Sequence, residues 1–140
     1  MRNRLKLVTE RWIRQLWQLG HADDVDELHT PGFCDHSPGG GRAGDNDGFK
    51  QGIREFYLAF PDFYTIIEDL VIDLDCNQVA VRWSATGTHR GPYLGVPATG
   101  RSLRFTGIEI LTVSGDRVAE RWGEWDLASL LAQLDRPVLS

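Results

Sequence analysis

The first candidates for chemistry are acidic residues near the C-terminal end of the chain. Glu124 lies in residues 120–126, which read Glu-Arg-Trp-Gly-Glu-Trp-Asp, so its carboxyl group stands between two tryptophans. A carboxylate beside a buried indole is costly unless it is paired or protonated. Glu124 is therefore expected either at a solvated rim or in a pocket that favours its protonated form, and the second position would make it a general acid or base.

Glu109 is the second candidate acid, in the middle of an expected strand. The turn at residues 114–116, Ser-Gly-Asp, would fold that strand back beside the strand that carries Glu124, with residues 108–110 opposite residues 121–124. Two neighbouring carboxyl groups repel each other, so one of them would keep its proton at neutral pH. Such a pair would act as a proton shuttle.

Both acids also have a structural interpretation. Glu109 could instead point to the outer face of the sheet and meet an arginine there, and Glu124 could be a surface carboxylate paired with Arg82 or Arg104. The chemical interpretation is general acid and base catalysis, in which one proton is removed from a substrate and another is donated to it. One carboxyl group could do both, and such general acid and base help is worth roughly 10²–10⁴ in rate.

Histidine and aromatic side chains are the candidates for substrate contact. A histidine can polarise a carbonyl group or share a proton near neutral pH. The four histidines show no metal-ligand spacing, so neither a metal nor another cofactor is expected. Five tryptophans in a small domain suit a hollow for a flat ligand, although such rings are core residues first. The candidate catalytic residues are Glu124, Glu109 and His36, and the residues expected to contact a substrate are Trp12, Phe33, Tyr57, Phe60, Arg82, His89 and Trp122.

The elements that position these residues follow from hydrophobic periodicity and from turn residues. Helices are expected over residues 4–19, 23–28, from Asp45 or Asn46 to residue 60, and 127–134. Strands are expected over residues 33–37, 63–73, 78–89, 101–113 and 117–126. Helices on one face of an antiparallel sheet make an α+β domain, and a strongly twisted sheet curls around them and leaves a hollow on its concave side.

Length and charge narrow the classes of function. A chain of 140 residues is expected to form a single domain over residues 1–140. Its net charge of -5 and its lack of basic stripes argue against nucleic acid or an anionic membrane as a partner. A secretory start and an apolar run of about 18 residues are both missing, so a soluble cytoplasmic protein is expected. Cys34 and Cys76 are expected to be reduced thiols.

Four segments, taken together, resemble the SnoaL-like polyketide cyclases of the nuclear transport factor 2-like superfamily. They are residues 33–38 (Phe-Cys-Asp-His-Ser-Pro), residues 59–63 (Ala-Phe-Pro-Asp-Phe), residues 87–101, which begin Gly-Thr-His-Arg-Gly and end Gly-Val-Pro-Ala-Thr-Gly-Arg, and residues 115–126. Each motif alone is weak, but their order and spacing cover nearly the whole chain.

This resemblance implies a fold and an activity. The fold is a cone, a curved and mostly antiparallel sheet wrapped over three helices around a central pocket, which usually dimerises through the outer sheet face. The activity is an intramolecular aldol cyclisation without metal or cofactor, in which an acidic residue of the last strand is the acid and base. The matching residue is Glu124, where a longer glutamate replaces the aspartate of family cyclases.

Three functions therefore stay open. The first is a cofactor-free cyclase or isomerase that acts on a polyketide-like or other small, hydrophobic, carbonyl-containing molecule. The second is hydrolysis of an epoxide or ester. It is disfavoured because relatives that open epoxides have a motif like Trp-Arg-Asp where this chain has Trp122, Gly123 and Glu124, so the arginine is missing. The third is a binding module without turnover, because this superfamily carries enzymes and non-catalytic binders on one scaffold.

Overall fold

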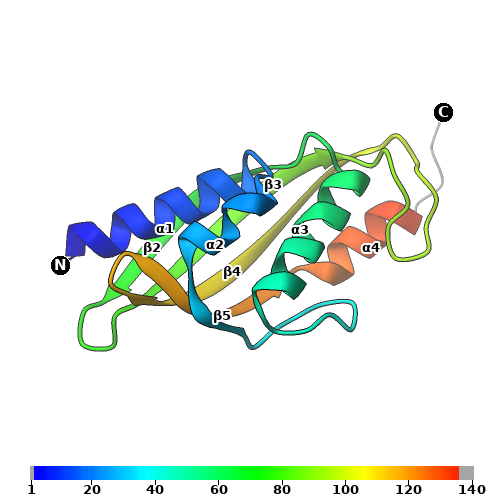
Figure 1. Ribbon diagram of the computed structural model, residues 1–140. Coiled ribbons are helices and arrows are strands. Elements are labelled where there is room, and N and C mark those ends of the chain that lie inside the picture. The colour runs from blue at the N-terminus through cyan, green and yellow to red at the C-terminus, as the bar shows by residue number, and fades with distance from the viewer. Residues whose placement is uncertain (1, 136–140) are drawn as a thin grey trace.

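The computed structural model describes residues 2–135, which form a five-stranded sheet and the helices that pack on it (Figure 1). The elements, in chain order, are α1 (Arg2–Trp17), η1 (Ala22–Asp24), α2 (Val25–Leu28), β1 (His29–Asp35), α3 (Asn46–Ala59), β2 (Tyr64–Asp73), β3 (Gln78–Thr88), β4 (Ser102–Ser114), β5 (Arg117–Trp125) and α4 (Leu127–Asp135). Helices α1, α2 and α3 lie over one face of the curved sheet. The predicted α+β class is therefore confirmed.

The sheet has the strand order β1-β5-β4-β3-β2. The pairs β2–β3, β3–β4 and β4–β5 are antiparallel. Strand β1 lies at the edge and pairs with β5 in parallel. The predicted fold-back of β4 onto β5 is confirmed, with Glu109 opposite Gly123. The parallel edge strand places Asp35 beside Arg121, although the two residues are far apart in the sequence.

Most element boundaries lie within two residues of the expected ones, and the largest difference is at β1. This strand begins at His29, so that it includes Pro31 and Gly32, which were expected to end a helix. Proline is tolerated on an edge strand because one side of that strand has no ladder to complete. The second helix is correspondingly short, since the 3-10 turn η1 precedes a single turn of α2.

Side-chain caps fix the two helices that border the region described below. The carboxylate of Asp45 accepts a hydrogen bond from the Gly48 amide at 2.8 Å and caps α3. The carboxylate of Asp126 accepts one from the Ser129 amide at 3.1 Å at the start of α4. Short acidic side chains satisfy the open amides of a first helical turn in this way.

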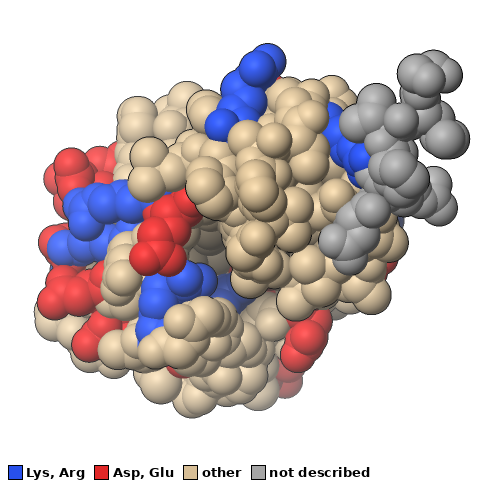
Figure 2. Space-filling view, turned by 90° about the vertical axis from the view of Figure 1, so that its right-hand side faces the viewer, with Lys and Arg blue, Asp and Glu red and all other residues tan. Residues whose placement is uncertain are grey.

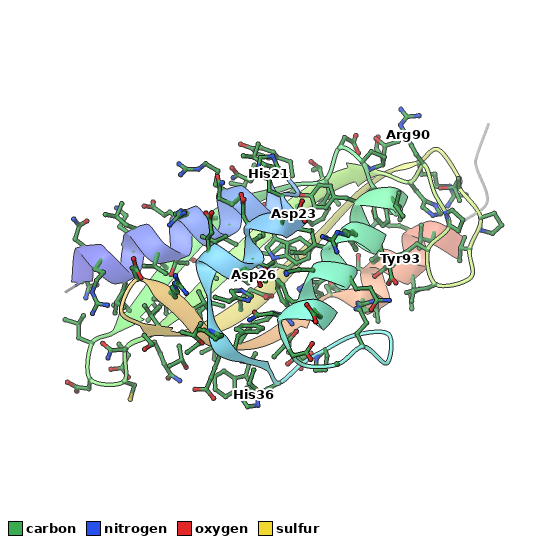
Figure 3. All side chains as sticks on the ribbon, viewed as in Figure 1. His21, Asp23, Asp26, His36, Arg90 and Tyr93 are labelled. Carbon is green, nitrogen blue, oxygen red and sulfur yellow. The ribbon has the colours of Figure 1, made fainter. Side chains whose placement is uncertain are left out.

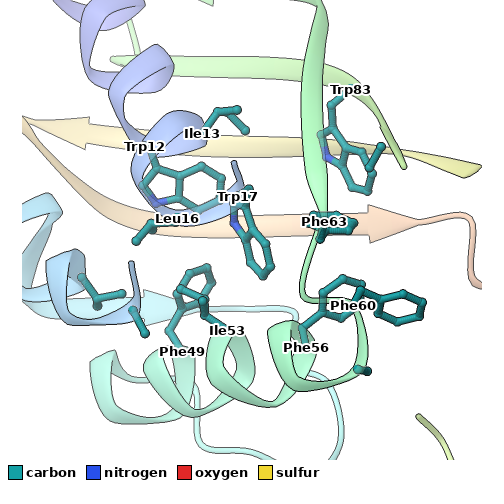
Figure 4. Packing of buried hydrophobic residues seen from close by; sticks show 14 of the residues in the cluster. Trp12, Ile13, Leu16, Trp17, Phe49, Ile53, Phe56, Phe60, Phe63 and Trp83 are labelled. Atoms are coloured by element: carbon teal, nitrogen blue, oxygen red, sulfur yellow. The ribbon is translucent and has the colours of Figure 1, made fainter. Parts of the chain in front are cut away.

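The interior between the helices and the sheet is filled with aromatic rings (Figure 4). Trp17 makes edge contacts with Phe56, Phe63 and Trp125, with ring centroids 5.5 to 6.1 Å apart. The cavity that remains beside Trp83 has a volume of about 10 Å³, room for roughly one water molecule. At this point of the concave face the rings leave little space, and the larger space on the same side of the sheet lies towards α3 and the loops described below.

The outer face of the sheet carries apolar side chains in contact with solvent. Ile66, Ile108 and Ile110 are exposed there, on three different positions of β2 and β4. Within residues 2–135, no helix is both long enough and apolar enough to cross a bilayer.

Candidate active site

A cleft of about 990 Å³ opens where α3, the start of α4 and the C-terminal end of β5 meet two loops, residues 36–45 and 89–101. Figure 2 shows a hollow on the side of the molecule that carries these loops, with charged side chains at its rim. The volume is at the upper end of the usual range for small-molecule sites, roughly 300–1,000 Å³. One part of the wall is polar, with Asp35, Ser37, Arg42 and Arg121, and the other is apolar, with Trp17, Phe56, Tyr93, Trp125 and Leu127.

Arg121 is the centre of a buried charge network in the polar wall. Its Nε donates a hydrogen bond to Glu109 Oε1 at 2.6 Å. Its Nη1 donates to both carboxylate oxygens of Asp35, at 3.0 and 3.2 Å, and to the backbone oxygen of Ser37 at 3.2 Å. The side chains of Arg121, Asp35 and Glu109 are exposed by only 7%, 6% and 3%. Three charged groups thus lie where charge is costly unless it is paired.

Two indoles complete the surroundings of Glu109. Trp125 Nε1 donates to Glu109 Oε2 at 3.0 Å, and Trp83 Nε1 donates to the same oxygen at 3.3 Å. With Arg121, the carboxylate accepts three hydrogen bonds, so both of its oxygens are already engaged. Glu109 is therefore better arranged to hold Arg121 in place than to take a proton from a substrate.

The network keeps Arg121 positively charged. Burial alone would lower the pKa of Arg121, but attraction to Glu109 and Asp35 and the hydrogen bonds to them outweigh it, so the pKa is raised. The guanidinium group therefore cannot act as a proton donor in a reaction. It can donate hydrogen bonds to a substrate oxygen that gains negative charge.

One nitrogen of Arg121 is available for that purpose. Among the contacts of residues 2–135, Nη2 of Arg121 has no hydrogen-bond acceptor, while Nε and Nη1 are all engaged. Arg121 and Gly123 both line the cleft. A Cβ atom on residue 123 would lie 2.1 Å from Nη2, so the glycine makes the space that the guanidinium occupies.

Asp35 is held at the cleft wall by the end of β1. The backbone amide of Ser37 donates to Asp35 Oδ1 at 2.9 Å, and the Ser37 hydroxyl accepts from the Gly123 amide at 3.1 Å. Within the described part of the chain, Oδ2 of Asp35 accepts only from Arg121 Nη1. Asp35 thus combines a partly open carboxylate oxygen with a position beside the open nitrogen of Arg121.

Glu124, the first candidate from the sequence, lies at the rim of this cleft. It is among the lining residues, but its side chain is exposed. Period-two alternation of β5 turns Arg121, Gly123 and Trp125 inward and Glu124 outward. Of the two positions expected for Glu124, the structure shows the solvated rim and not the enclosed pocket. The expected pair with Glu109 does not form either, because the two carboxyl groups lie on opposite faces of the sheet.

Two predicted site residues beside it, His36 and Trp122, also lie on the outer side. Their rings stack with centroids 4.3 Å apart, and His36 Nε2 lies 2.9 Å from a carboxylate oxygen of Glu120. His36 borders the cleft at its rim, where Figure 3 places it near the end of the sheet. The expected substrate contact of Arg82 is wrong as well, because its side chain is exposed and bonded to Asp69 on the outer face.

The other predicted contact residues are part of the core. His89 is fully buried, stacks on the ring of Phe60 and has its Nδ1 3.0 Å from the Thr99 hydroxyl. Burial lowers the pKa of His89. The five other residues predicted to contact a substrate do not border the cleft. They are Trp12, Phe33, Tyr57, Phe60 and His89. Their rings were assigned to a hollow that the structure fills with the rings themselves.

The residues that sequence reasoning missed are Asp35, Ser37, Arg42 and Arg121. Asp35 and Arg121 each lie in a recognised motif, residues 33–38 and 115–126, but neither was selected as a site residue. No group of three or more His, Cys, Asp or Glu side chains in residues 2–135 is arranged to hold a metal ion.

Comparison with known proteins identifies one family. The family model for SnoaL-like polyketide cyclase matches residues 7–134. A candidate polyketide cyclase of known structure from Acidithiobacillus ferrooxidans is 27% identical, with a TM-score of 0.83 over 94% of each chain. IdmH from Streptomyces antibioticus, also a candidate polyketide cyclase, is 30% identical, with a TM-score of 0.75 over 89% of this chain and 94% of that chain.

TsrD from Streptomyces laurentii has the same fold, with 24% identity and a TM-score of 0.84 over 96% of this chain and 97% of that chain. At this level of identity the similarity concerns the fold alone. No curated protein matches the sequence significantly.

Proposed function

The chain belongs to the SnoaL-like polyketide cyclase family, and from this premise we propose that it closes a ring in a small polycarbonyl compound by proton transfer, without a cofactor. The family and the solved neighbours support a cyclase or isomerase. The observation that carries the finer proposal is the open edge of the Asp35–Arg121 pair on the wall of a cleft of about 990 Å³.

Arg121 and Asp35 divide the chemistry between them. Nη2 of Arg121 donates a hydrogen bond to a substrate carbonyl oxygen and stabilises the negative charge that develops there. Asp35 takes the proton from the carbon next to that carbonyl group, which forms an enolate. The enolate carbon attacks a second carbonyl carbon of the same molecule, and Asp35 returns its proton to the resulting alkoxide. One C–C bond and one O–H bond form, and no other reactant is consumed.

Glu109 is a positioning residue in this scheme. It binds the far side of Arg121 through Nε, and the two indole donors hold its carboxylate in turn. Without Glu109, the guanidinium would lose one of its two buried countercharges and its fixed orientation. The apolar wall formed by Phe56, Tyr93 and Trp125 suits the flat, unsaturated body of a polyketide-like substrate.

Two rival assignments remain for the site. The family resemblance assigns acid and base catalysis to Glu124, which could reach a substrate only from the rim. A binding module is the second rival, because both oxygens of Asp35 already accept hydrogen bonds from Arg121, as in a purely structural ion pair. The proposal expects turnover that depends on Asp35, the first rival expects turnover that depends on Glu124, and the binding module expects no turnover.

The test is ring closure of linear aromatic polyketones, followed by absorbance and mass spectrometry in the presence of EDTA. We expect turnover by the wild type, and a loss of at least about 10²-fold in kcat for Asp35→Asn with little change in KM. The control variant Glu124→Gln should retain most of its activity. Binding of the polyketones with a raised Tm but no product would instead support the binding module, and loss of turnover only in Glu124→Gln would move the catalytic role to the rim.

A further inference from the structure

Arg42 is a second arginine on the cleft wall, and the mechanism above does not use it. It lies in the loop of residues 36–45, and its side chain is 27% exposed. Its Nη1 donates a hydrogen bond to Glu55 Oε2 of α3 at 2.8 Å. Within residues 2–135, this is the one side-chain hydrogen bond of Arg42, so most of its N–H groups have no protein acceptor.

Three glycines make room for this guanidinium group. A Cβ atom on Gly52 would lie 3.0 Å from Nε of Arg42 and 3.4 Å from its Nη2, so the side chain rests directly on the surface of α3. Cβ atoms on Gly39 and Gly40 would lie 3.2 and 2.9 Å from its two terminal nitrogens. The guanidinium group thus packs against backbone of both the loop and the helix at the edge of the cleft.

The bond to Glu55 is easy to exchange. Glu55 is half-exposed, and exposed ion pairs contribute only about 0–1 kcal/mol. Glu55 also has a second partner, because Gln51 Nε2 donates to its Oε1 at 2.9 Å. Glu55 can therefore release Arg42 to a ligand without becoming a buried, unpaired charge.

Tyr93 supplies a second donor to the same region of the cleft. Its ring packs on Phe56 of α3 with centroids 5.4 Å apart, and Figure 3 shows it beside α3 and α4. Paired backbone hydrogen bonds with Val96, at 3.0 and 2.9 Å, fix its position in the loop. Burial raises the pKa of the Tyr93 hydroxyl while the positive charge of Arg42 lowers it, so the net shift is upward and the hydroxyl remains a donor.

We infer that Arg42, with Tyr93, forms a carboxylate subsite at the cleft edge, and that the natural substrate is an acidic polycarbonyl compound whose carboxylate replaces Glu55 as the partner of Arg42. A planar guanidinium with open N–H groups matches the two oxygens of a carboxylate. The carboxylate would anchor one end of the substrate while Arg121 binds a carbonyl oxygen. This inference rests on the proposed function, since it takes the cleft as the substrate site.

The test compares the binding of 2-naphthoate and its uncharged analogue 2-naphthamide by calorimetry at pH 7.5. Wild-type protein should bind the carboxylate about tenfold more tightly than the amide, as expected for a charge-assisted hydrogen-bonded pair. Arg42→Gln should abolish this preference without changing the affinity for the amide. Glu55→Gln should tighten 2-naphthoate binding by about fivefold, because it removes the competing carboxylate.

Arg54→Gln is the matched control, because Arg54 lies next to Glu55 on α3 but pairs with Asp23 and does not line the cleft. It should leave both affinities unchanged. The inference is overturned if neither probe binds, if the two bind equally, if Arg42→Gln keeps the preference for the carboxylate, or if Arg54→Gln loses it. Because this measurement reads binding alone, its failure is separate from a failure of the Asp35 turnover test.

Discussion

His29 shows how one buried side chain sets the response of this protein to acid. Trp12 Nε1 donates to His29 Nε2 at 2.8 Å, so the proton of the neutral ring is on Nδ1, which donates to Asn46 Oδ1 at 3.0 Å. The ring also stacks on Phe33 at 3.7 Å. Burial lowers the pKa of His29 from 6.5 to about 4, and the hydrogen bond to Asn46 offsets only part of this.

His29 should therefore lower the free energy of unfolding of this protein as the pH falls. Between pH 6.5 and about pH 4, His29 is protonated in the unfolded chain but stays neutral in the folded chain. The free energy of unfolding therefore has no contribution from this titration above pH 6.5. It falls as the pH drops towards 4, by up to ~1.4 kcal/mol per pH unit and about 3 kcal/mol in total. Urea unfolding between pH 4.5 and 7.5, followed by tryptophan fluorescence, measures this slope.

His29→Gln should flatten the slope, although it lowers stability at pH 7.5 through lost packing. His21→Gln is the control, since His21 is half-exposed beside Asp24 and should leave the slope nearly unchanged. A slope that is equal in His29→Gln and the wild type would show that His29 is not the group that titrates.

At the residue scale, the sequence predicted a carboxylate among aromatic rings but did not show which acidic residue would be buried there. A carboxylate among aromatic rings was a sound expectation, and Glu109 meets it, with two indoles and an arginine around it. Asp35 was overlooked because nothing in a sequence shows that an aspartate of the first strand will lie beside an arginine of the last. That contact depends on a long-range parallel pairing.

At the scale of elements, β5 determines which groups reach the cleft. Both faces of this strand carry a tryptophan and charged residues, so hydrophobic alternation alone does not show which face is buried. The structure turns the Arg121 face inward, because Arg121 finds two buried carboxylates there and Gly123 provides the space. The alternation is a local property of the strand, whereas the face that is buried depends on these long-range contacts.

Gly123 should accordingly be intolerant of even a methyl group. In Gly123→Ala the new Cβ would lie 2.1 Å from Arg121 Nη2 and 2.8 Å from Glu109 Oε2, so the guanidinium must move away from its partners. A broken buried ion pair costs roughly 3–5 kcal/mol when one partner is lost, and a displacement should cost part of that. Thermal unfolding should show a Tm lower by several degrees, together with lost turnover.

Gly32→Ala is the comparison for this prediction, because a Cβ there meets no atom within 4 Å and Gly32 lies in the same sheet, on β1. It should change the Tm little. An unchanged Tm in Gly123→Ala would mean that the network adjusts freely and that Gly123 does not position Arg121.

The helices and long strands could be predicted from the sequence because their periodicity and caps are local. Helix α3 begins where Asp45 caps it, and the strands of the β4–β5 hairpin follow from the turn at residues 114–116. The edge strand β1 could not be placed in the same way, since Pro31 and Gly32 have local preferences against a strand and only pairing with β5 overrides them.

At the scale of the whole molecule, the outer sheet face is left uncovered. Exposed Ile66, Ile108 and Ile110 lie on it, and exposed apolar side chains that lie close together mark association sites. We propose, as the family resemblance implies, that a second copy of the chain covers this face. Light scattering should report a dimer for the wild type and a monomer for Ile108→Glu, while Leu58→Glu, a change at an exposed residue of α3, should stay dimeric. A wild-type monomer would contradict this.

The curved sheet and its helices also explain why the reactive groups lie where they do. Aromatic rings fill the interior beside Trp83, and the larger space on the concave side of the sheet lies where two loops and two helices diverge. Arg121 reaches this space from the sheet, and Asp35 reaches it from the edge strand. In the proposed reaction, Asp35 removes a proton next to a ketone bound in the cleft while Arg121 binds the ketone oxygen.

Deuterium incorporation into 2-tetralone, a flat bicyclic ketone, tests this claim without knowledge of the natural substrate. Proton NMR in heavy-water buffer measures exchange at the carbon between the ring and the carbonyl group. The wild type and Glu124→Gln should accelerate exchange over buffer, and Asp35→Asn should be slower than either by about 10²-fold. Exchange by Asp35→Asn at the wild-type rate, or its loss in Glu124→Gln alone, would contradict the account.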